Sequence, residues 1–198
     1  MKETVIDLLR HGEPVGGRKY RGQSDDPLSE LGWTQMRSKL AGHVPWQRVI
    51  SSPLLRCRAF AEELCGARNL PLRLDDRLKE VGFGVWEGKT RAQLSAEDPN
   101  QLARFRADPV HARPPGAEPM EQFYKRVAAA LDEIVVRHRD EHILIVCHAG
   151  VIRMALAHTL GMPLGHAYRI EVASAALTRL AVTHSAAPRL VFHDGRLA

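Results

Sequence analysis

The chain has 198 residues, a length that suits one domain with a substantial hydrophobic core. Its composition, 44% hydrophobic and 26% charged, is ordinary for a soluble globular protein. The net charge of +5 would suit nucleic acid or an anionic small molecule. The arginines are scattered, however, with no basic tail and no aromatic-rich strand pattern, so we expect a small-molecule partner and no nucleic acid.

No apolar stretch approaches the roughly 20 residues of a membrane span, and no signal peptide is expected, so the sequence predicts no membrane partner. The three cysteines, Cys57, Cys65 and Cys147, lack the spacing of a disulfide framework, which fits a reducing cytoplasm. No repeat or linker divides the chain. We therefore expect a single domain over residues 1–198; the sequence does not predict the oligomeric state.

Short apolar runs predict β-strands, and helical patterns lie between several of them. Such alternation favours an α/β fold, a three-layer sandwich with helices on both sides of a largely parallel sheet. The strands are expected at Val5–Leu9, Arg48–Ser51, Leu70–Leu74, Ile143–Cys147, Leu177–Thr183 and Leu190–His193.

Four helices have clear start or stop signals. Ser29 is a predicted N-cap, Pro53 opens the next helix in its first turn, and Gly161 ends the last one. The longest pattern, "PMEQFYKRVAAALDEIVVRHR", has one apolar face made of Phe123, Val127, Leu131, Ile134 and Val135. Before it, the proline-rich residues 108–119 predict a loop, either a flap or an insertion.

Basic residues follow three of the predicted strands. The first strand ends in Arg10-His11-Gly12, the second in "SSPLLRCR", and a later one in "VCHAGVIR", the last two running into helices. Ligands of α/β folds bind beyond the carboxyl ends of strands, and helix N-termini offer free N–H groups. Together these segments predict a binding site for an anion, and phosphate suits it best.

Two glutamates, Glu80 and Glu87, lie in "RLKEVGFGVWEG" around a glycine-rich turn. They are either ordinary surface carboxylates or the source of a proton for a leaving oxygen. Catalysis near neutral pH would need burial, or the negative charge of a substrate, to raise the pKa of such a carboxyl.

Five motifs in order, "LLRHGE", "RGQSDDPLSELG", "SSPLLRCR", "LKEVGFGVWEG" and "VCHAGVIR", resemble the histidine phosphatase superfamily, also called phosphoglycerate-mutase-like. The resemblance covers almost the whole chain. Within the superfamily, "FGVWEG" and the "RCRAFAEEL" helix look most like the α-ribazole phosphatases of cobalamin synthesis.

The resemblance implies a phosphatase fold and mechanism. His11 would be the nucleophile and form a phosphohistidine, Glu80 would be the general acid and base, and His148 would stabilise the transition state. Arg10 and Arg56 would hold the phosphoryl oxygens and help keep His11 neutral. No metal or other cofactor is required.

The remaining substrate contacts are also implied by the family. Arg21, Gly22 and the backbone of Ala149 are expected to bind the substrate, whereas Lys19 is either a contact or solvated. Arg56 is chosen over Arg58 by its distance from the second serine, and Glu80 over Glu87 because it follows "RL-x". Glu87 is then structural. Gly12 would let the backbone turn, and Glu13 would organise the arginines.

The interval from Glu80 to His148 distinguishes phosphatase from mutase. In the phosphoglycerate mutases it is long and supplies basic residues that grip the substrate, whereas here it is short, although it contains Arg104, Arg106 and Arg113. We expect residues 88–120 to form a helical and loop cap, with a site open enough for water. This favours a phosphatase, and a mutase is the alternative.

Three other interpretations of the sequence compete with a histidine phosphatase. Cys147 and Arg153 have the spacing of a cysteine-dependent phosphatase, but this leaves Arg10, His11 and Glu80 without a role. A catalytically silent phosphate-binding protein is disfavoured because all the catalytic residue types are present. His138 and His142 lie four residues apart, but we interpret them as part of a polar loop, not as metal ligands.

Overall fold

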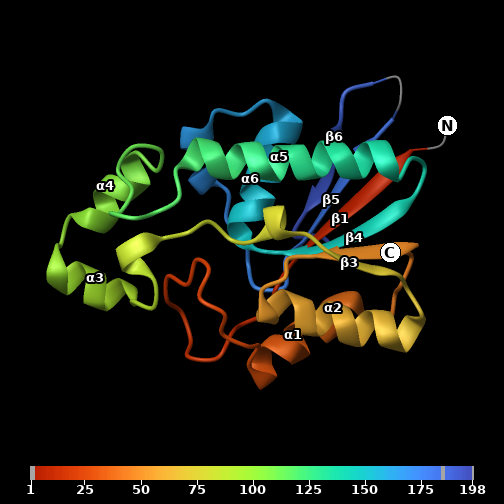
Figure 1. Ribbon diagram of the computed structural model, residues 1–198, viewed down its shortest axis with the longest axis horizontal. Helices are drawn as coiled ribbons and strands as arrows, with labels where there is room; N and C mark the ends of the chain where they lie inside the picture. The colour runs from red at the N-terminus through yellow and green to blue at the C-terminus, as the bar shows by residue number, and fades with distance from the viewer. Residues whose placement is uncertain (1–2, 184–185, 198) are drawn as a thin grey trace.

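A mixed β-sheet forms the middle layer of the protein, whose computed structural model describes residues 3–183 and 186–197 (Figure 1). Across the sheet the strands are ordered β3-β2-β4-β1-β5-β6. Their bounds are β1 (Thr4–Arg10), β2 (Arg48–Ser51), β3 (Leu72–Leu74), β4 (His142–Cys147), β5 (Leu177–Val182) and β6 (Arg189–His193). Every predicted strand is confirmed, and the main difference is that β3 begins at Leu72, not Leu70.

The four strands from β3 to β1 run parallel, whereas β5 and β6 are antiparallel to their neighbours. The sheet is therefore largely parallel, as the alternation of elements predicted, and β5 is antiparallel to both of its neighbours. The segment between Val182 and Arg189 is too short for the crossover that a parallel pair requires, so β5 and β6 form an antiparallel pair.

Helices cover both faces of the sheet, which confirms the three-layer α/β fold. In Figure 1, α1 (Glu30–Leu40) and α2 (Leu55–Arg68) lie below the sheet, and α5 (Met120–Arg137) and α6 (Ala149–Leu160) lie above it. Successive residues of the central strands enter two separate cores. Ile6, Leu8, Ile143 and Ile145 pack on the α5 and α6 side, whereas Leu9, Leu144 and Val146 pack on the α1 and α2 side.

The helix ends show which local signals were correct. Ser29 caps α1 as predicted, its hydroxyl accepting from the Gly32 N–H, and Gly161 ends α6 with a φ of +61°. Pro53 was assigned wrongly to the first turn of α2, because Leu54 is the N-cap there. This helix also continues through Gly66 and ends at Asn69, which adopts the left-handed conformation instead.

Two short helices, α3 (Arg91–Glu97) and α4 (Gln101–Ala107), project at the left end of the molecule in Figure 1. The proline-rich residues 108–119 form the predicted loop between α4 and α5. The 3₁₀ helices η1 (Asp76–Leu78) and η2 (Gly84–Trp86) precede α3, and η3 (Leu164–Arg169) follows α6. The backbone pairs Phe83, just before η2, with Ala117 of the loop, so these segments are held together.

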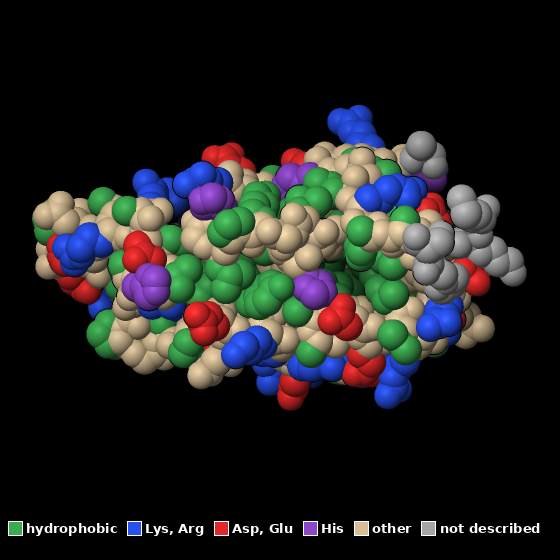
Figure 2. Space-filling view, turned by 90° about the horizontal axis from the view of Figure 1, so that it is seen from above, with side chains coloured by type: hydrophobic (Ala, Val, Ile, Leu, Met, Phe, Trp, Pro, Cys, Tyr) green, Lys and Arg blue, Asp and Glu red, His purple; other side chains and the backbone are tan. Residues whose placement is uncertain are grey.

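Figure 2 views the molecule from above Figure 1, and hydrophobic side chains gather along the middle of that face with charged ones around them. Such a mixture is usual for a protein surface. Among the described residues, no helix combines the length and the apolar character needed to cross a membrane.

The three strands that are followed by basic segments lie side by side. In the order β2-β4-β1, the register pairs Ser51 with Val146 and Cys147 with Arg10. Because all three strands are parallel, their carboxyl ends meet at one edge of the sheet. The segments that follow them, including His11 and His148, therefore converge there.

Candidate active site

His11 is buried directly after β1, in a defined tautomer. Its Nδ1 lies 2.7 Å from the carbonyl oxygen of Gly12, which can only accept, so Nδ1 carries the proton. Nε2 therefore has the free lone pair, and the Nε–H of Arg56 is directed at it over 3.4 Å. The backbone N–H of His11 donates to Cys147, which fixes the residue against β4.

Arg10 and Arg56 bring two guanidinium groups to His11. Arg56 is 1% exposed and donates to the carbonyl oxygens of Gly22 and Ser24 at 2.8 and 2.7 Å. Arg10 donates through Nη1 to the Val172 oxygen at 2.6 Å, and its buried Nε has no hydrogen-bond partner among the described residues. Burial lowers the pKa of Arg10 to about 10, still high enough for a full charge near neutral pH.

His148 is fully buried at the N-cap position of α6, with its ring centroid 5.2 Å from that of His11. Its Nε2 lies 2.8 Å from the hydroxyl of Ser52, and the Sγ atom of Cys57 lies 3.6 Å from the same nitrogen. These contacts from the segment after β2 fix the ring orientation.

Both histidines are held in the neutral form. Burial is the main cause that lowers the pKa of His11 well below its usual value, followed by the charges of Arg10 and Arg56. Burial also lowers the pKa of His148 well below its usual value, with the charge of Arg56 acting in the same direction. The site therefore presents an unprotonated imidazole among positive charges.

Glu80 reaches this edge from the segment after η1. Its carboxylate accepts from its neighbour Val81 at 2.9 Å and from the Gly150 N–H, near the start of α6, at 3.1 Å. Arg126 holds the chain behind it by donating to the Glu80 carbonyl oxygen, and two further bonds tie Arg126 to Glu118. The carboxylate thus occupies a half-buried, fixed position beside α6.

Glu87 has a different position from Glu80 and joins two loops. Its carboxylate accepts from the backbone N–H groups of Gln23, Ser24 and Phe83. Gly22 adopts a φ of +53°, and a Cβ there would lie 2.0 Å from the Glu87 carboxylate. The glycine is thus required by both backbone conformation and space, which agrees with a structural Glu87.

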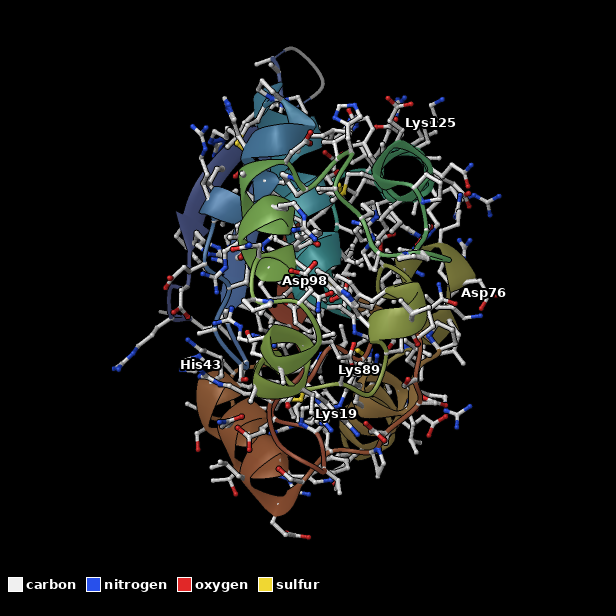
Figure 3. All side chains as sticks on the ribbon, turned by 90° about the vertical axis from the view of Figure 1, so that its left-hand side faces the viewer. Lys19, His43, Asp76, Lys89, Asp98 and Lys125 are labelled. Atoms are coloured by element: carbon white, nitrogen blue, oxygen red, sulfur yellow. The ribbon has the colours of Figure 1, made fainter. Side chains whose placement is uncertain are left out.

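Arg21 and Lys19 lie in the loop after His11 and share the carboxylate of Asp26, at 2.8 and 2.9 Å. Arg21 also donates to the Val15 carbonyl oxygen at 2.6 Å and is nearly buried. Figure 3 views this end of the molecule, with Lys19 and Lys89 labelled close together. The Tyr20 N–H donates to the Lys89 oxygen, so this loop is tied to the segment after η2.

Gly12 has a reason other than the turn that the sequence suggested. A Cβ on Gly12 would lie 2.1 Å from the Gly32 oxygen, and one on Gly32 would lie 2.1 Å from the Glu13 oxygen. The two glycines allow the His11 loop and α1 to touch through their backbones. The Glu13 carbonyl accepts from Ser29, so this part of Glu13 holds the start of α1 instead of the arginines.

The rejected alternatives have clear structural positions. Arg58 is on the solvent side of α2, 40% exposed and 3.7 Å from Glu62. Cys147 is inside β4, where burial raises the pKa of its thiol well above the usual value and disfavours a thiolate. His142 begins β4, and its ring contacts the Asp7 carboxylate at 2.8 Å, so it is part of the strand and not of the polar loop expected for it.

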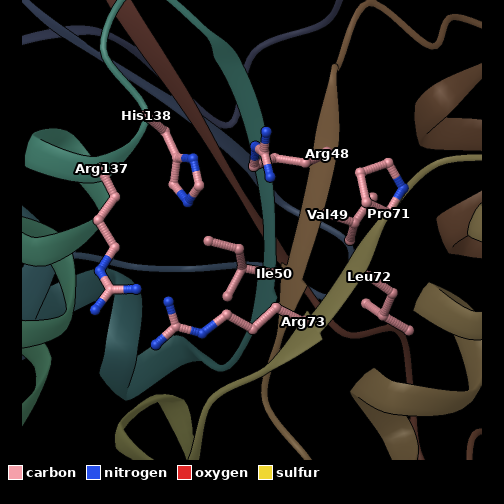
Figure 4. A pocket seen from close by; sticks show the side chains of 8 residues that line it. All are labelled: Arg48, Val49, Ile50, Pro71, Leu72, Arg73, Arg137 and His138. Atoms are coloured by element: carbon pink, nitrogen blue, oxygen red, sulfur yellow. The ribbon is translucent and has the colours of Figure 1, made fainter.

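The pocket in Figure 4, with a volume near 310 Å³, lies at the opposite end of the strands. It is lined by residues that begin β2 and β3 and by the end of α5. Its cations are already paired, since Arg73 and Arg137 both contact Glu133. It therefore offers no free positive charge comparable to the site around His11.

Sequence reasoning missed several residues that support the site. Ser52 and Cys57 lie within the quoted "SSPLLRCR" motif, but their contacts to His148 depend on how β2 and β4 pair. Arg126 is one of many charged residues on α5, and nothing in the sequence distinguishes it. In the part of the chain that the structure describes, no cluster of three or more histidine, cysteine or carboxylate side chains is arranged to hold a metal ion.

Known proteins resemble this chain in both sequence and structure. Mycobacterial glucosyl-3-phosphoglycerate phosphatase Rv2419c superposes with a TM-score of 0.84 at 28% identity, over 96% of this chain and 97% of that one. The adenosylcobalamin/alpha-ribazole phosphatase of Salmonella typhimurium is 32% identical over 170 residues, 83% of this chain and 84% of that protein.

A longer relative is the bifunctional protein Rv2228c of Mycobacterium tuberculosis, 33% identical over 202 residues. The match takes in 98% of this chain but 55% of that protein, so the chain spans about half the length of this relative. The model of the histidine phosphatase superfamily (branch 1) matches residues 6–194. The chain therefore belongs to the histidine phosphatase superfamily.

Proposed function

We propose that the protein is a metal-independent phosphatase that hydrolyses small phosphomonoesters through a phosphohistidine on Nε2 of His11. One observation carries the proposal most strongly. The bond from Nδ1 of His11 to the Gly12 oxygen leaves the Nε2 lone pair free, beside the guanidinium of Arg56. A neutral imidazole with its lone pair among cations is the nucleophile that attack on a phosphate dianion requires.

In the first step, Nε2 of His11 forms a bond to phosphorus while the bond to the leaving oxygen breaks. Arg10 and Arg56 bind the non-bridging oxygens and offset their charge. His148 and the Ala149 N–H, at the start of α6, stabilise the transition state. The unpartnered Nε of Arg10 and the contact of Arg56 Nε with His11 support this role, because neither guanidinium has a carboxylate partner among the described residues.

Glu80 gives its proton to the leaving oxygen and, in the second step, accepts a proton from the attacking water. The resulting phosphorus–oxygen bond replaces the phosphorus–nitrogen bond, so phosphate leaves and His11 returns to its starting form. The bond from Glu80 to Gly150 supports the role, since it holds the carboxyl next to the helix that carries His148.

Residues 88–120 cap this site within a single domain over residues 1–198, in our proposal. Support comes from contacts across the cap: Arg113 donates to the Gly82 oxygen, and the Val85 N–H donates to Pro115. The interval between Glu80 and His148 is short, which favours access of water and hydrolysis over the retention that a mutase needs. Arg21 and Gly22 contact the substrate in this proposal and Lys19 stays an alternative; Arg21 is the stronger candidate because its charge also acts on His11.

The substrate class is a small phosphate ester, and no nucleic acid or membrane enters the proposal. α-Ribazole 5′-phosphate is one candidate, supported by the named activity of the Salmonella relative. The mycobacterial structural neighbour supports a different ester, a glucosylated phosphoglycerate.

The test is a kinetic screen of phosphate esters with a chelator present. It includes p-nitrophenyl phosphate, α-ribazole 5′-phosphate and 3-phosphoglycerate. We expect hydrolysis that resists the chelator and is lost in His11→Ala, whereas Cys147→Ser retains it. Loss of activity with the chelator, dominant mutase activity, or survival of His11→Ala would overturn the proposal.

A further inference from the structure

A second positive group lies next to Arg10. Arg10 donates to the carbonyl oxygen of Val172, and Arg153 donates through Nε to that of Ile170 at 3.0 Å. The two carbonyls are two residues apart, and Ile170 has an extended backbone. Alternate residues of an extended chain are about 7 Å apart, so the two guanidinium groups are close neighbours. The charge of Arg153 accordingly contributes to the lowered pKa of Arg10.

Arg153 has no ion-pair partner in the described part of the chain. Its guanidinium carbon lies 4.9 Å from the centre of the Tyr168 ring, and its Nε bonds a neutral carbonyl. No carboxylate of residues 3–183 or 186–197 forms an ion pair with it, although many other arginines of the described chain have such a partner. Two like charges held together are costly unless a negative group offsets them.

Arg113 adds a third cation whose charge acts on Tyr168. Its guanidinium stacks near Phe105, 6.0 Å from the ring centre, and Phe105 in turn lies 5.0 Å from Tyr168. Nε and Nη1 of Arg113 are buried without a hydrogen-bond partner among the described residues. Burial raises the pKa of Tyr168 to about 12, while the charges of Arg153 and Arg113 oppose that rise. The phenol therefore stays protonated, as a hydrogen-bond donor.

The position of this group relative to Glu80 identifies what it would bind. Gly150, which donates to the Glu80 carboxylate, precedes Arg153 by three residues on α6, so both lie on one face of the helix. In the proposed mechanism Glu80 touches the leaving oxygen. Arg153 and Tyr168 therefore lie on the side of the leaving alcohol, beyond the phosphoryl group held by Arg10.

We propose that Arg153 and the Tyr168 hydroxyl bind a second anionic group of the substrate, carried by the leaving alcohol, with Arg113 reinforcing the positive charge there. The preferred substrates are then phosphomonoesters whose alcohol bears a carboxylate or a further phosphate. This inference rests on the proposed phosphatase function and narrows its substrate class.

Two matched pairs of esters test the inference. 3-Phosphoglycerate and glycerol 3-phosphate share one carbon chain and differ in a carboxylate against a hydroxymethyl group. Fructose 1,6-bisphosphate and fructose 6-phosphate differ in a second phosphate. We expect kcat/KM to favour the more anionic member of at least one pair by about tenfold, the worth of one charge-assisted contact. The pair that shows the preference identifies the second anion.

Variants connect this preference to the named residues. Arg153→Gln should reduce the ratio of kcat/KM within the preferred pair about tenfold, mainly through KM, and Arg153→Lys should restore much of it. Tyr168→Phe, which keeps the contact with Phe105, should reduce the ratio by a smaller factor. Arg139→Gln is the matched control, since Arg139 is exposed between α5 and β4, far from the site.

The outcomes separate this inference from the proposed function. Hydrolysis with no preference in either pair, or an unchanged ratio in Arg153→Gln, overturns the second-anion site alone. Failure to hydrolyse any ester, p-nitrophenyl phosphate included, overturns the proposed function and the inference with it.

Discussion

The Nε–H of Arg56 is directed at Nε2 of His11 across 3.4 Å, from a helix 45 residues further along the chain. The same guanidinium donates to the backbone oxygens of Gly22 and Ser24, so one side chain joins the strand end, the loop after it and the start of α2. Since those oxygens use Nη1 and Nη2, a phosphoryl group at His11 meets a guanidinium with a fixed plane.

Arg56→Lys should therefore lower kcat/KM more than the loss of one hydrogen bond would. Lysine keeps the charge, but it cannot bond both loop oxygens and face His11 at once. We expect a fall of about 100-fold with p-nitrophenyl phosphate, roughly 2.7 kcal/mol of transition-state stabilisation. Arg58→Lys, on the exposed side of the same helix, is the control and should stay within about twofold of the parent. Equal effects in both variants would contradict the role given to Arg56.

Glu80→Gln should separate the two chemical steps. The amide oxygen can still accept from Gly150, so the fold of the site is retained. In the first step, p-nitrophenolate leaves without much help from an acid, so the loss of Glu80 has little effect there. In the second step, water attacks the phosphohistidine, and the variant lacks the base that accepts its proton. We expect turnover to fall about 100-fold or more and the phosphoenzyme to accumulate.

A rapid-quench experiment with acid-labile phosphate as the readout checks this. A burst close to one phosphate per protein is expected in Glu80→Gln and none in Glu87→Gln, whose carboxylate holds two loops and not the site. Slow turnover without a burst would place the block before phosphoryl transfer and contradict the second role of Glu80.

Sequence could predict which segments converge where this depends on the ends of strands. His11 and His148 follow apolar runs that could only be buried strands, and parallel strands bring such ends together. Arg56 could be identified only from its spacing within the motif, because an arginine near the start of a helix is usually solvated. Only the structure gives a physical reason to choose Arg56 over Arg58. Arg56 is 1% exposed, whereas the side chain of Arg58 is 40% exposed.

Other contacts could not be predicted, because they join residues whose packing no local pattern encodes. Arg153 was considered only as a partner of Cys147, yet its Nε bonds Ile170, beyond the end of η3. Likewise, the start of α2 at Leu55 depends on the segment between β1 and α1, where Asp25 accepts from the Leu55 N–H. Such bonds between distant segments override the propensity of a single proline.

The two buried histidines should make the fold sensitive to mild acid. Their pKa values are lowered in the folded protein, so the unfolded chain binds protons first as pH falls below about 6.5. Stability is then lost as pH decreases from 6.5, by up to about 1.4 kcal/mol per pH unit for each histidine. Urea unfolding between pH 7 and pH 5 should show this, before most carboxylates titrate.

His11→Gln provides the comparison. It removes one of the two groups, so the slope of the unfolding free energy against pH should decrease by up to about 1.4 kcal/mol per pH unit. An unchanged slope would mean that His11 is protonated in the folded protein near pH 6, which is incompatible with its proposed role as a neutral nucleophile.

The contact between the His11 loop and α1 predicts that replacing glycine by alanine, which usually stabilises a helix, destabilises the protein at Gly32. Alanine is favoured over glycine inside a helix by about 1 kcal/mol, so Gly66→Ala in α2, where a Cβ meets nothing within 4 Å, should stabilise the protein by about that amount.

In Gly32→Ala the new Cβ would lie 2.1 Å from the Glu13 carbonyl oxygen, and backbone must shift to make room. We expect Gly32→Ala to destabilise the fold by about 1–3 kcal/mol in urea unfolding. It should also reduce kcat, because Glu13 and His11 are two residues apart. A gain in stability from both alanines would show that α1 and the His11 loop are not in backbone contact.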